Sequence, residues 1–124
     1  MRVIRGKYRG RKFSPPKNFP SRPTTDYAKE SLFNILENKV HFEDSHVLDL
    51  FAGTGNISLE FLSRGVLSVL SIDSSFVSFK FMKKALNEIG IDNWKVIKND
   101  VFKYAVKIER QYEIVFADPP FGLK

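Results

Sequence analysis

Four short apolar runs in this chain each contain, or are followed by, an acidic residue, and stretches with helical spacing separate them. Strands that alternate with helices favour parallel βαβ units, so we predict an α/β fold with an open, mostly parallel sheet and helices on both faces. In such sheets ligands bind beyond the carboxyl ends of the strands. The acids that we expect to meet there are Asp49, Asp73, Asp100 and Asp118.

The apolar pattern places the strands at residues 47–51, 67–72, 94–97 and 113–117. Helices are predicted at residues 56–64, from a Ser75 cap to residue 89, and from the third strand to about residue 108. Upstream, Thr24 or Thr25 caps a helix that runs to about residue 38. Its core-facing residues, by helical spacing, are Ala28, Leu32, Ile35 and Leu36.

Length and composition fit one globular domain, since the chain has 124 residues of which 43% are hydrophobic. It contains no Cys, which excludes a disulfide framework, a thiolate metal site and a thiol nucleophile. Its longest nearly apolar run, at residues 66–72, is far shorter than the roughly 20 residues of a spanning helix. Because the first residues carry no secretory signal, we expect a cytoplasmic protein that binds no membrane.

The positive charge is concentrated at the N-terminus. Residues 1–25 hold eight of the 20 Lys and Arg residues and no Asp or Glu, so the remainder has a net charge of −2. We divide the chain into a basic arm with a proline-rich connector, residues 1–23, and a domain at 24–124. The arm is predicted to form a hairpin from residues 2–5 and 8–13, and its charge favours nucleic-acid phosphates over the alternative of a hairpin that only aids solubility. The arm residues assigned to nucleic acid are Arg2, Arg5, Lys7, Arg9 and Arg11.

The first predicted strand leads into a glycine loop of the kind that approaches a ligand closely. Gly53 and Gly55 allow a tight turn, although an ordinary strand–helix turn would also use them. A dinucleotide-binding loop would place a third glycine where Ser58 stands, which disfavours a nicotinamide-dependent oxidoreductase. The loop with Asp49 in front fits S-adenosylmethionine (SAM) better, and we assign Asp49, Phe51, Gly53, Thr54 and Gly55 to its amino acid half.

Two further acids complete a nucleoside site. Asp73, with Ser74 beside it, is placed to accept hydrogen bonds from ribose hydroxyls, or alternatively to cap the next helix. Asp100 is placed to accept from an adenine amine while Val101 and Phe102 line the ring, although Asp100 too could be a helix cap.

The fourth predicted strand runs into Asp118, Pro119, Pro120 and Phe121. Two prolines stiffen this loop, so that the Asp118 carboxylate and a nearby carbonyl can bind the hydrogens of a planar amine while Phe121 stacks on its base. Such binding frees the amine lone pair to attack a methyl sulfonium, with no metal and no covalent intermediate. The four residues are therefore our candidate catalytic group.

These motifs, in this order, resemble class I SAM-dependent amino-methyltransferases. The opening residues 2–11 and the stretches at 22–26 and 29–36 are similar to bacterial small-subunit (16S) ribosomal RNA guanine-N2 methyltransferases of the D type. The resemblance implies a Rossmann-like fold and methyl transfer from SAM to a guanosine N2 amine, with S-adenosylhomocysteine as product. It implies as substrate the small subunit or an assembly intermediate, and we expect a monomer. It also implies that Arg22, Thr24 and Lys29 lie beside the entering RNA.

The resemblance has one departure, because family members continue through about three more strands beyond the Asp118 loop. The C-terminal strands are therefore expected to be missing from this sequence, with the fourth strand at an open, apolar sheet edge. Two alternatives stay open. One is an adenine-N6 methyltransferase, which usually has Asn where this chain has Asp118. The other is a non-catalytic RNA-binding or assembly factor of the same fold.

Overall fold

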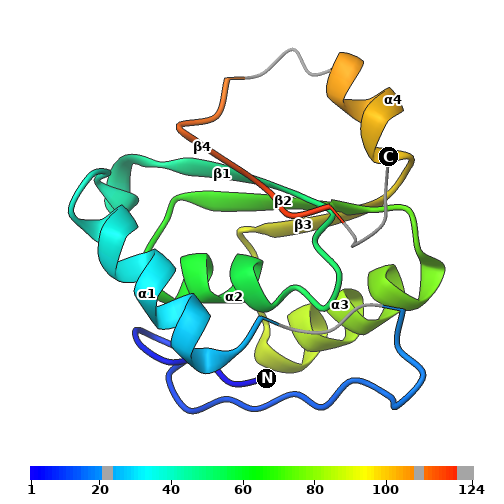
Figure 1. The fold of residues 1–124 in the computed structure, drawn as a ribbon, viewed down its shortest axis with the longest axis horizontal. Helices are drawn as coiled ribbons and strands as arrows, with labels where there is room; N and C mark the ends of the chain where they lie inside the picture. The colour runs from blue at the N-terminus through cyan, green and yellow to red at the C-terminus, as the bar shows by residue number, and fades with distance from the viewer. Residues whose placement is uncertain (21–23, 108–110, 120–124) are drawn as a thin grey trace.

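The computed structural model describes residues 1–20, 24–107 and 111–119. Its centre is a parallel four-stranded sheet in the order β3-β2-β1-β4 (Figure 1). The strands are β1 (His46–Leu50), β2 (Ser68–Asp73), β3 (Trp94–Lys98) and β4 (Ile114–Ala117). The predicted open parallel sheet is thus confirmed, with each strand within one or two residues of its predicted bounds.

The helices carry the caps that the sequence indicates. α1 (Asp26–Glu37) has Thr25 as its N-cap, and α3 (Phe76–Ile89) begins after Ser75 and ends at Gly90. α2 (Asn56–Ser63) begins after Gly55, and the six-residue α4 (Val101–Val106) begins after Asp100. A short 3-10 helix, η1 (Phe42–Asp44), precedes β1. None of the described helices is long and apolar enough to cross a membrane.

Helices cover the two faces of the sheet unequally. α1, α2 and α3 lie on one face and α4 on the other (Figure 1). The larger core lies under the three helices, where Phe33, Phe42 and Phe61 pack edge to face. Side chains alternate along a strand, so Val47 and Asp49 of β1 face this core, whereas Leu48 packs with Leu70, Ile72 and Val101 on the α4 side.

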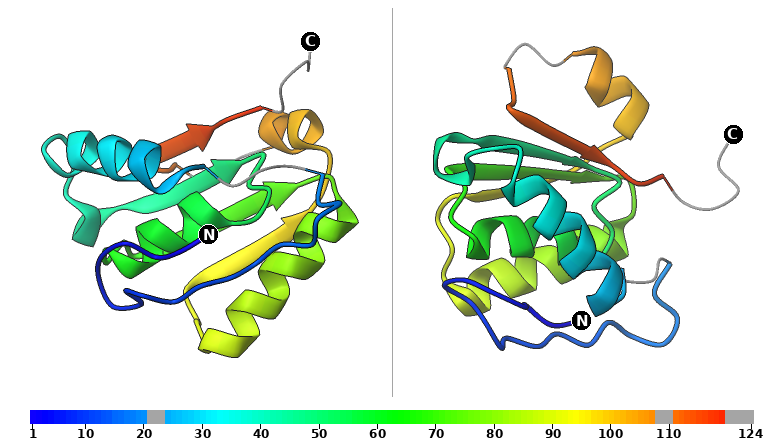
Figure 2. Two further views of the ribbon diagram at one scale, coloured as in Figure 1. Left: turned by 60° about the horizontal axis from the view of Figure 1, so that its bottom comes forward. Right: turned by 60° about the vertical axis from the view of Figure 1, so that its left-hand side comes forward.

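The N-terminal arm packs against α2, on the same side of the sheet as the three helices in both views of Figure 2. The expected hairpin forms between the ends of the arm, where the Val3 N–H donates to the Arg11 carbonyl at 2.9 Å and the Phe13 N–H to the Met1 carbonyl at 3.0 Å, around an isolated antiparallel bridge at residue 2. Backbone groups of residues 4, 5 and 7 bond to α2 side chains or carbonyls instead of to one another. Gly6 approaches so closely that a Cβ atom there would lie 1.9 Å from the Ser63 carbonyl oxygen.

The inward face of α1 differs from the predicted one. Its buried residues are Lys29 and Phe33, with Leu32 and Leu36 partly buried beside them. Ala28 and Ile35 are exposed, which corrects the prediction for those two residues. The helix is rotated because Lys29 has buried polar partners on α2.

Candidate active site at the carboxyl ends of the strands

The loop between β1 and α2 turns sharply and is tied to the neighbouring strand. Phe51 and Gly53 have positive φ angles of 58° and 60°, and Gly55 follows with 80°. The N–H of Ala52 donates to the Ile72 carbonyl at 3.0 Å. Positive φ is costly for a residue with a side chain, so Phe51 is held in place by its surroundings.

Gly55 has no room for a side chain. A Cβ atom there would lie 2.8 Å from Met82 Cγ of α3 and 3.1 Å from Trp94 Cζ2 of β3. Thr54 beside it is buried, and its hydroxyl accepts from the N–H of Asn56 at 3.3 Å. The glycine therefore lets α2 begin close against α3, and close packing fixes where the loop lies.

Asp73 joins two of the predicted elements directly. One of its carboxylate oxygens accepts from the Gly53 N–H at 2.8 Å, and the other accepts from the Ser75 N–H at 2.9 Å. The cap of α3 is Ser75, so the helix-cap alternative does not apply to Asp73 itself. Each oxygen retains acceptor capacity, and the carboxylate is half-buried beside the exposed Ser74.

Asp49 lies beneath the loop, one residue before the end of β1, and is only 1% exposed. A buried hydrogen-bonded row runs from it across the sheet. Ser58 Oγ donates to the Asp49 carboxylate at 2.5 Å and lies 2.5 Å from Ser71 Oγ. Trp94 Nε1 donates to the same Ser71 hydroxyl at 2.8 Å. The row fixes α2 to β1, β2 and β3.

Burial raises the pKa of Asp49 to about 7, against the opposing effect of the Ser58 hydrogen bond. The negative charges of Asp73 and Asp118 add to the rise. Three of the four predicted acids are therefore close enough to interact electrostatically, as expected for carboxylates at one sheet edge.

Asp100 is the N-cap of α4, and its side chain accepts from the Lys103 N–H at 3.0 Å. The cap alternative is therefore realised, while the exposed carboxylate keeps further acceptor capacity. Val101 is buried under α4, so its side chain does not line an open site. Phe102 is 59% exposed and packs edge to face with Phe51 at 5.7 Å between ring centroids.

Asp118 follows the edge strand β4. Leu50 is the register partner of Ala117, so Asp118 and Phe51 leave neighbouring strands at the same level. Asp118 and Pro119 are exposed, whereas Pro120 and Phe121 lie outside the described residues. Among the described residues, β4 pairs only with β1; Ile114 is buried and Val115 is 57% exposed.

The residues assigned to RNA differ in availability. Arg2 and Arg5 are exposed but pair with Asp26 and Glu30 at 3.1 and 3.7 Å. Lys7, Arg9 and Arg11 are exposed, and Arg22 lies outside the described residues. Thr24 is half-buried, with its carbonyl accepting from Asn56 Nδ2 at 2.9 Å.

The prediction for Lys29 is corrected, because its side chain is fully buried and ion-paired with Glu60. A cation in that position cannot contact RNA. The sequence reasoning also missed the row from Asp49 to Trp94. Its signal was Ser71, a polar residue between the apolar Leu70 and Ile72.

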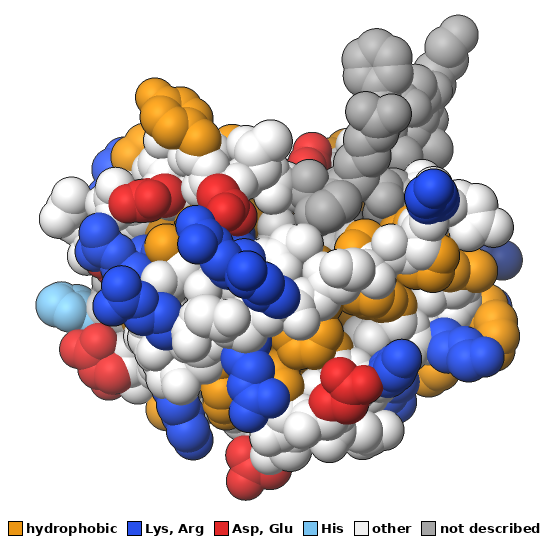
Figure 3. Space-filling view, turned by 90° about the horizontal axis from the view of Figure 1, so that it is seen from below, with side chains coloured by type: hydrophobic (Ala, Val, Ile, Leu, Met, Phe, Trp, Pro, Cys, Tyr) orange, Lys and Arg blue, Asp and Glu red, His pale blue; other side chains and the backbone are white. Residues whose placement is uncertain are grey.

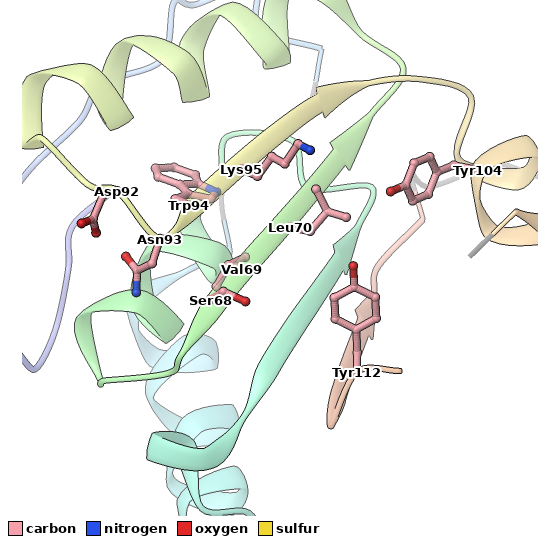
Figure 4. A pocket seen from close by; sticks show the side chains of 9 residues that line it. All are labelled: Ser68, Val69, Leu70, Asp92, Asn93, Trp94, Lys95, Tyr104 and Tyr112. Atoms are coloured by element: carbon pink, nitrogen blue, oxygen red, sulfur yellow. The ribbon is translucent and has the colours of Figure 1, made fainter. Parts of the chain in front are cut away.

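A cavity of about 320 Å³ lies away from this site, beside the amino ends of β2 and β3 (Figure 4). Tyr104 of α4 and Tyr112 ahead of β4 both turn their hydroxyl ends toward Leu70. It contains none of the predicted site residues. The candidate site is therefore the opposite end of the sheet.

Comparisons with known proteins support the same family from sequence and from structure. The family model described as conserved hypothetical protein 95 matches residues 1–124. Ribosomal RNA small subunit methyltransferase D of Buchnera aphidicola subsp. Baizongia pistaciae is 36% identical over 98% of this chain and 61% of its own length. The protein of that name in Escherichia coli K12 is 35% identical over 98% and 60%. The chain thus spans about three-fifths of these curated relatives.

A solved structure of a putative methyltransferase from Escherichia coli, yhhF, superposes with a TM-score of 0.87. It is 35% identical, and the match covers 100% of this chain and 67% of that one. The likeness confirms the Rossmann-like methyltransferase fold that the sequence resemblance implied.

Proposed function

The chain belongs to the conserved hypothetical protein 95 family, that of ribosomal RNA small subunit methyltransferase D, and on that premise we propose that it forms the SAM-binding part of an rRNA methyltransferase. The observation that carries the proposal is the Asp73 carboxylate, which accepts a hydrogen bond from Gly53 in the loop after β1. The ribose-binding acid and the glycine loop thereby form one site, and the carboxyl groups of Asp49 and Asp118 border it.

The donors and acceptors at this edge fit the groups of SAM. Asp73 accepts the ribose hydroxyls with its remaining lone pairs, and Ser74 lies next to it. Asp100 accepts the adenine amine, with the backbone of Val101 and the ring of Phe102 beside the base. The loop residues Phe51, Gly53, Thr54 and Gly55 bind the amino acid half, and Asp49 is buried below them. When bound, SAM supplies a methyl group on a positively charged sulfur.

Asp118 acts on the substrate amine. Its carboxylate accepts a hydrogen bond from one amine N–H. This bond frees the nitrogen lone pair for attack and stabilises the positive charge that develops on the nitrogen during methyl transfer. Pro119 and Pro120 fix the loop, and Phe121 stacks on the target base. The level register of Ala117 with Leu50 favours this role, because it brings the Asp118 loop beside the cofactor loop.

The basic arm contacts RNA phosphates through Lys7, Arg9 and Arg11, which are exposed and form no ion pair with the residues that the structure describes. Arg2 and Arg5 are held against α1 by acids, so their contribution is smaller. Arg22 and Thr24 are proposed to lie beside the entering strand.

We further propose the exocyclic N2 amine of a guanosine in small-subunit rRNA as the methyl acceptor, with the subunit or an assembly intermediate as substrate. The protein acts as a cytoplasmic monomer without a metal. An amine with two hydrogens suits the two acceptors of the Asp118 loop.

The test supplies tritiated SAM with purified small ribosomal subunits, with naked rRNA and with DNA. We expect label in the subunits, released on digestion as N2-methylguanosine. Label in DNA or in N6-methyladenosine would favour the adenine-specific alternative. SAM binding by calorimetry without transfer to any substrate would favour a non-catalytic assembly factor.

A further inference from the structure

α3 has a second apolar face that the sheet does not cover. Its inner row, Ser78, Met82 and Ala85, is buried against the sheet. On the outside, Phe76 and Val77 are 60% and 47% exposed. Figure 3 shows this side of the molecule, with hydrophobic side chains lying among Lys and Arg side chains toward the right.

The connector after the arm turns this face into a groove. Phe19 of the connector packs edge to face on Phe81 of α3, with ring centroids 5.4 Å apart. Between connector and helix lies a cavity of about 450 Å³, which Phe19, Phe76, Val77 and Phe81 line. That volume falls within the roughly 300–1,000 Å³ of small-molecule sites, so a flat ring can enter it.

The charged residues that line the groove are basic. Lys80 and Lys84 lie one and two helical turns after Phe76 and line the same cavity. Lys12 of the arm lines the adjoining hollow with Lys84 and Glu88. Glu88 is 4.0 Å from Lys84, but both side chains are more than half exposed, so the pair is weak. The groove therefore offers aromatic rings with a flanking positive potential.

We propose that this groove binds a single-stranded RNA segment that flanks the target nucleotide. Aromatic faces for bases beside cations for phosphates are the combination that single-stranded nucleic acid requires. The groove also opens next to the proposed cofactor site, because Ser75, whose N–H binds Asp73, immediately precedes Phe76. This identification of the flanking strand rests on the proposed function.

The first test separates stacking from simple hydrophobic burial at Phe76. Fluorescence anisotropy measures the Kd of the full chain for a fluorescein-labelled oligouridylate. Phe76→Leu, which keeps an apolar side chain, is expected to weaken binding about fivefold or more, since a stacked base contributes roughly 1–3 kcal/mol. Phe76→Tyr, which keeps the ring, is expected to stay within about twofold of the parent.

The second test removes charge from a residue pair in the groove and from a matched pair elsewhere. Lys80→Gln with Lys84→Gln is expected to reduce the slope of log Kd against log salt by about 1.4, or about 0.7 for each phosphate that the protein no longer neutralises. The control is Lys95→Gln with Lys107→Gln, which removes equal charge from two exposed residues on β3 and after α4. Its slope is expected to equal that of the parent.

Unchanged affinity in Phe76→Leu, or equal slopes in the two double variants, would overturn the proposal. If Phe76→Leu weakened binding to the assembled subunit but not to the oligonucleotide, the assignment of the groove to single-stranded RNA would be wrong. SAM affinity, measured by calorimetry on each variant, is expected to match that of the parent. Failure of the parent to bind SAM would instead contradict the proposed function. The oligonucleotide measurements would then still show whether the groove binds single-stranded RNA.

Discussion

The Lys29 ammonium lies 3.2 Å from the Glu60 carboxylate, and neither side chain is exposed. Lys29 also donates to Asn56 Oδ1 at 2.7 Å and to the Arg2 carbonyl. One cation thus connects the arm, α1 and the first residue of α2, immediately after the glycine loop that follows β1. Burial lowers the pKa of Lys29, against the opposing effect of the Glu60 charge.

Glu60 is the central acceptor of this cluster. Its two oxygens accept from the N–H groups of Ile4 at 2.9 Å and Arg5 at 3.2 Å, and Arg64 Nε lies 2.8 Å away. Burial by itself would raise the pKa of Glu60. The hydrogen bonds from Ile4 and Arg64, with the charge of Lys29, outweigh that effect and hold the pKa below its ordinary value.

We expect Glu60→Gln to destabilise the protein by about 3 kcal/mol or more, because it leaves the buried Lys29 without its counter-charge. Urea unfolding measures the change. Glu88→Gln, which breaks the exposed pair with Lys84, is the control and should cost under about 1 kcal/mol. As pH falls below 4.5, the ordinary pKa of Glu, the Glu60 carboxylate of the unfolded parent becomes protonated. The parent should therefore lose stability relative to Glu60→Gln, which has no carboxylate to titrate at this position. Equal costs in the two variants would contradict this account of the cluster.

Gly55 and Gly90 form a matched pair of left-handed glycines. Their φ angles are 80° and 77°, but a Cβ atom at Gly55 meets Met82 and Trp94 whereas at Gly90 it meets nothing within 4 Å. Gly90→Ala should therefore cost only the backbone strain, about 1–2 kcal/mol. Gly55→Ala should cost roughly 1–3 kcal/mol more, from overpacking. Thermal unfolding of both variants measures the difference between their losses of stability. A difference near zero would show that Met82 and Trp94 move aside without an energetic cost.

The Asp49 carboxyl predicts a pH dependence of stability. Its folded pKa of about 7 lies above the ordinary 3.8, so the folded state holds the proton more tightly. The stabilisation is complete below pH 3.8 and is lost as pH rises to about 7. Each pKa unit corresponds to about 1.4 kcal/mol.

Asp49→Asn keeps an acceptor for Ser58 and cannot titrate. The parent is therefore expected to lose a few kcal/mol relative to this variant across that pH window, as urea unfolding would measure. Parallel pH profiles for the two proteins would contradict the raised pKa.

The sequence predicted the sheet well because its signals were local. Apolar strands, the serine and threonine caps and Gly90 each act within a few residues. The meeting of Asp73 with Gly53 also followed, because parallel strands bring their carboxyl ends to one edge. The location of the site was therefore predictable from the sheet topology, whereas composition alone does not indicate it.

Interactions between distant segments were not predictable in the same way. By sequence alone Lys29 is predicted to be an exposed cation, because its buried partner Glu60 lies 31 positions later in the chain. The pattern about Gly6 predicts a hairpin, and the ends of the arm do pair, but no local signal indicates that the residues beside Gly6 bond to α2. Val101 follows the same rule, since only the position of α4 decides that its side chain turns inward.

The most direct test of the account is the separation of methyl transfer from SAM binding in Asp118→Ala. With tritiated SAM and small ribosomal subunits, we expect this variant to lose transfer by at least about a hundredfold, while calorimetry finds a SAM Kd within a few-fold of the parent. Asp73→Ala serves as the contrasting variant and should lose SAM affinity itself. If Asp118→Ala transferred methyl groups at the parental rate, the loop after β4 would not carry the chemistry and the central claim would be wrong.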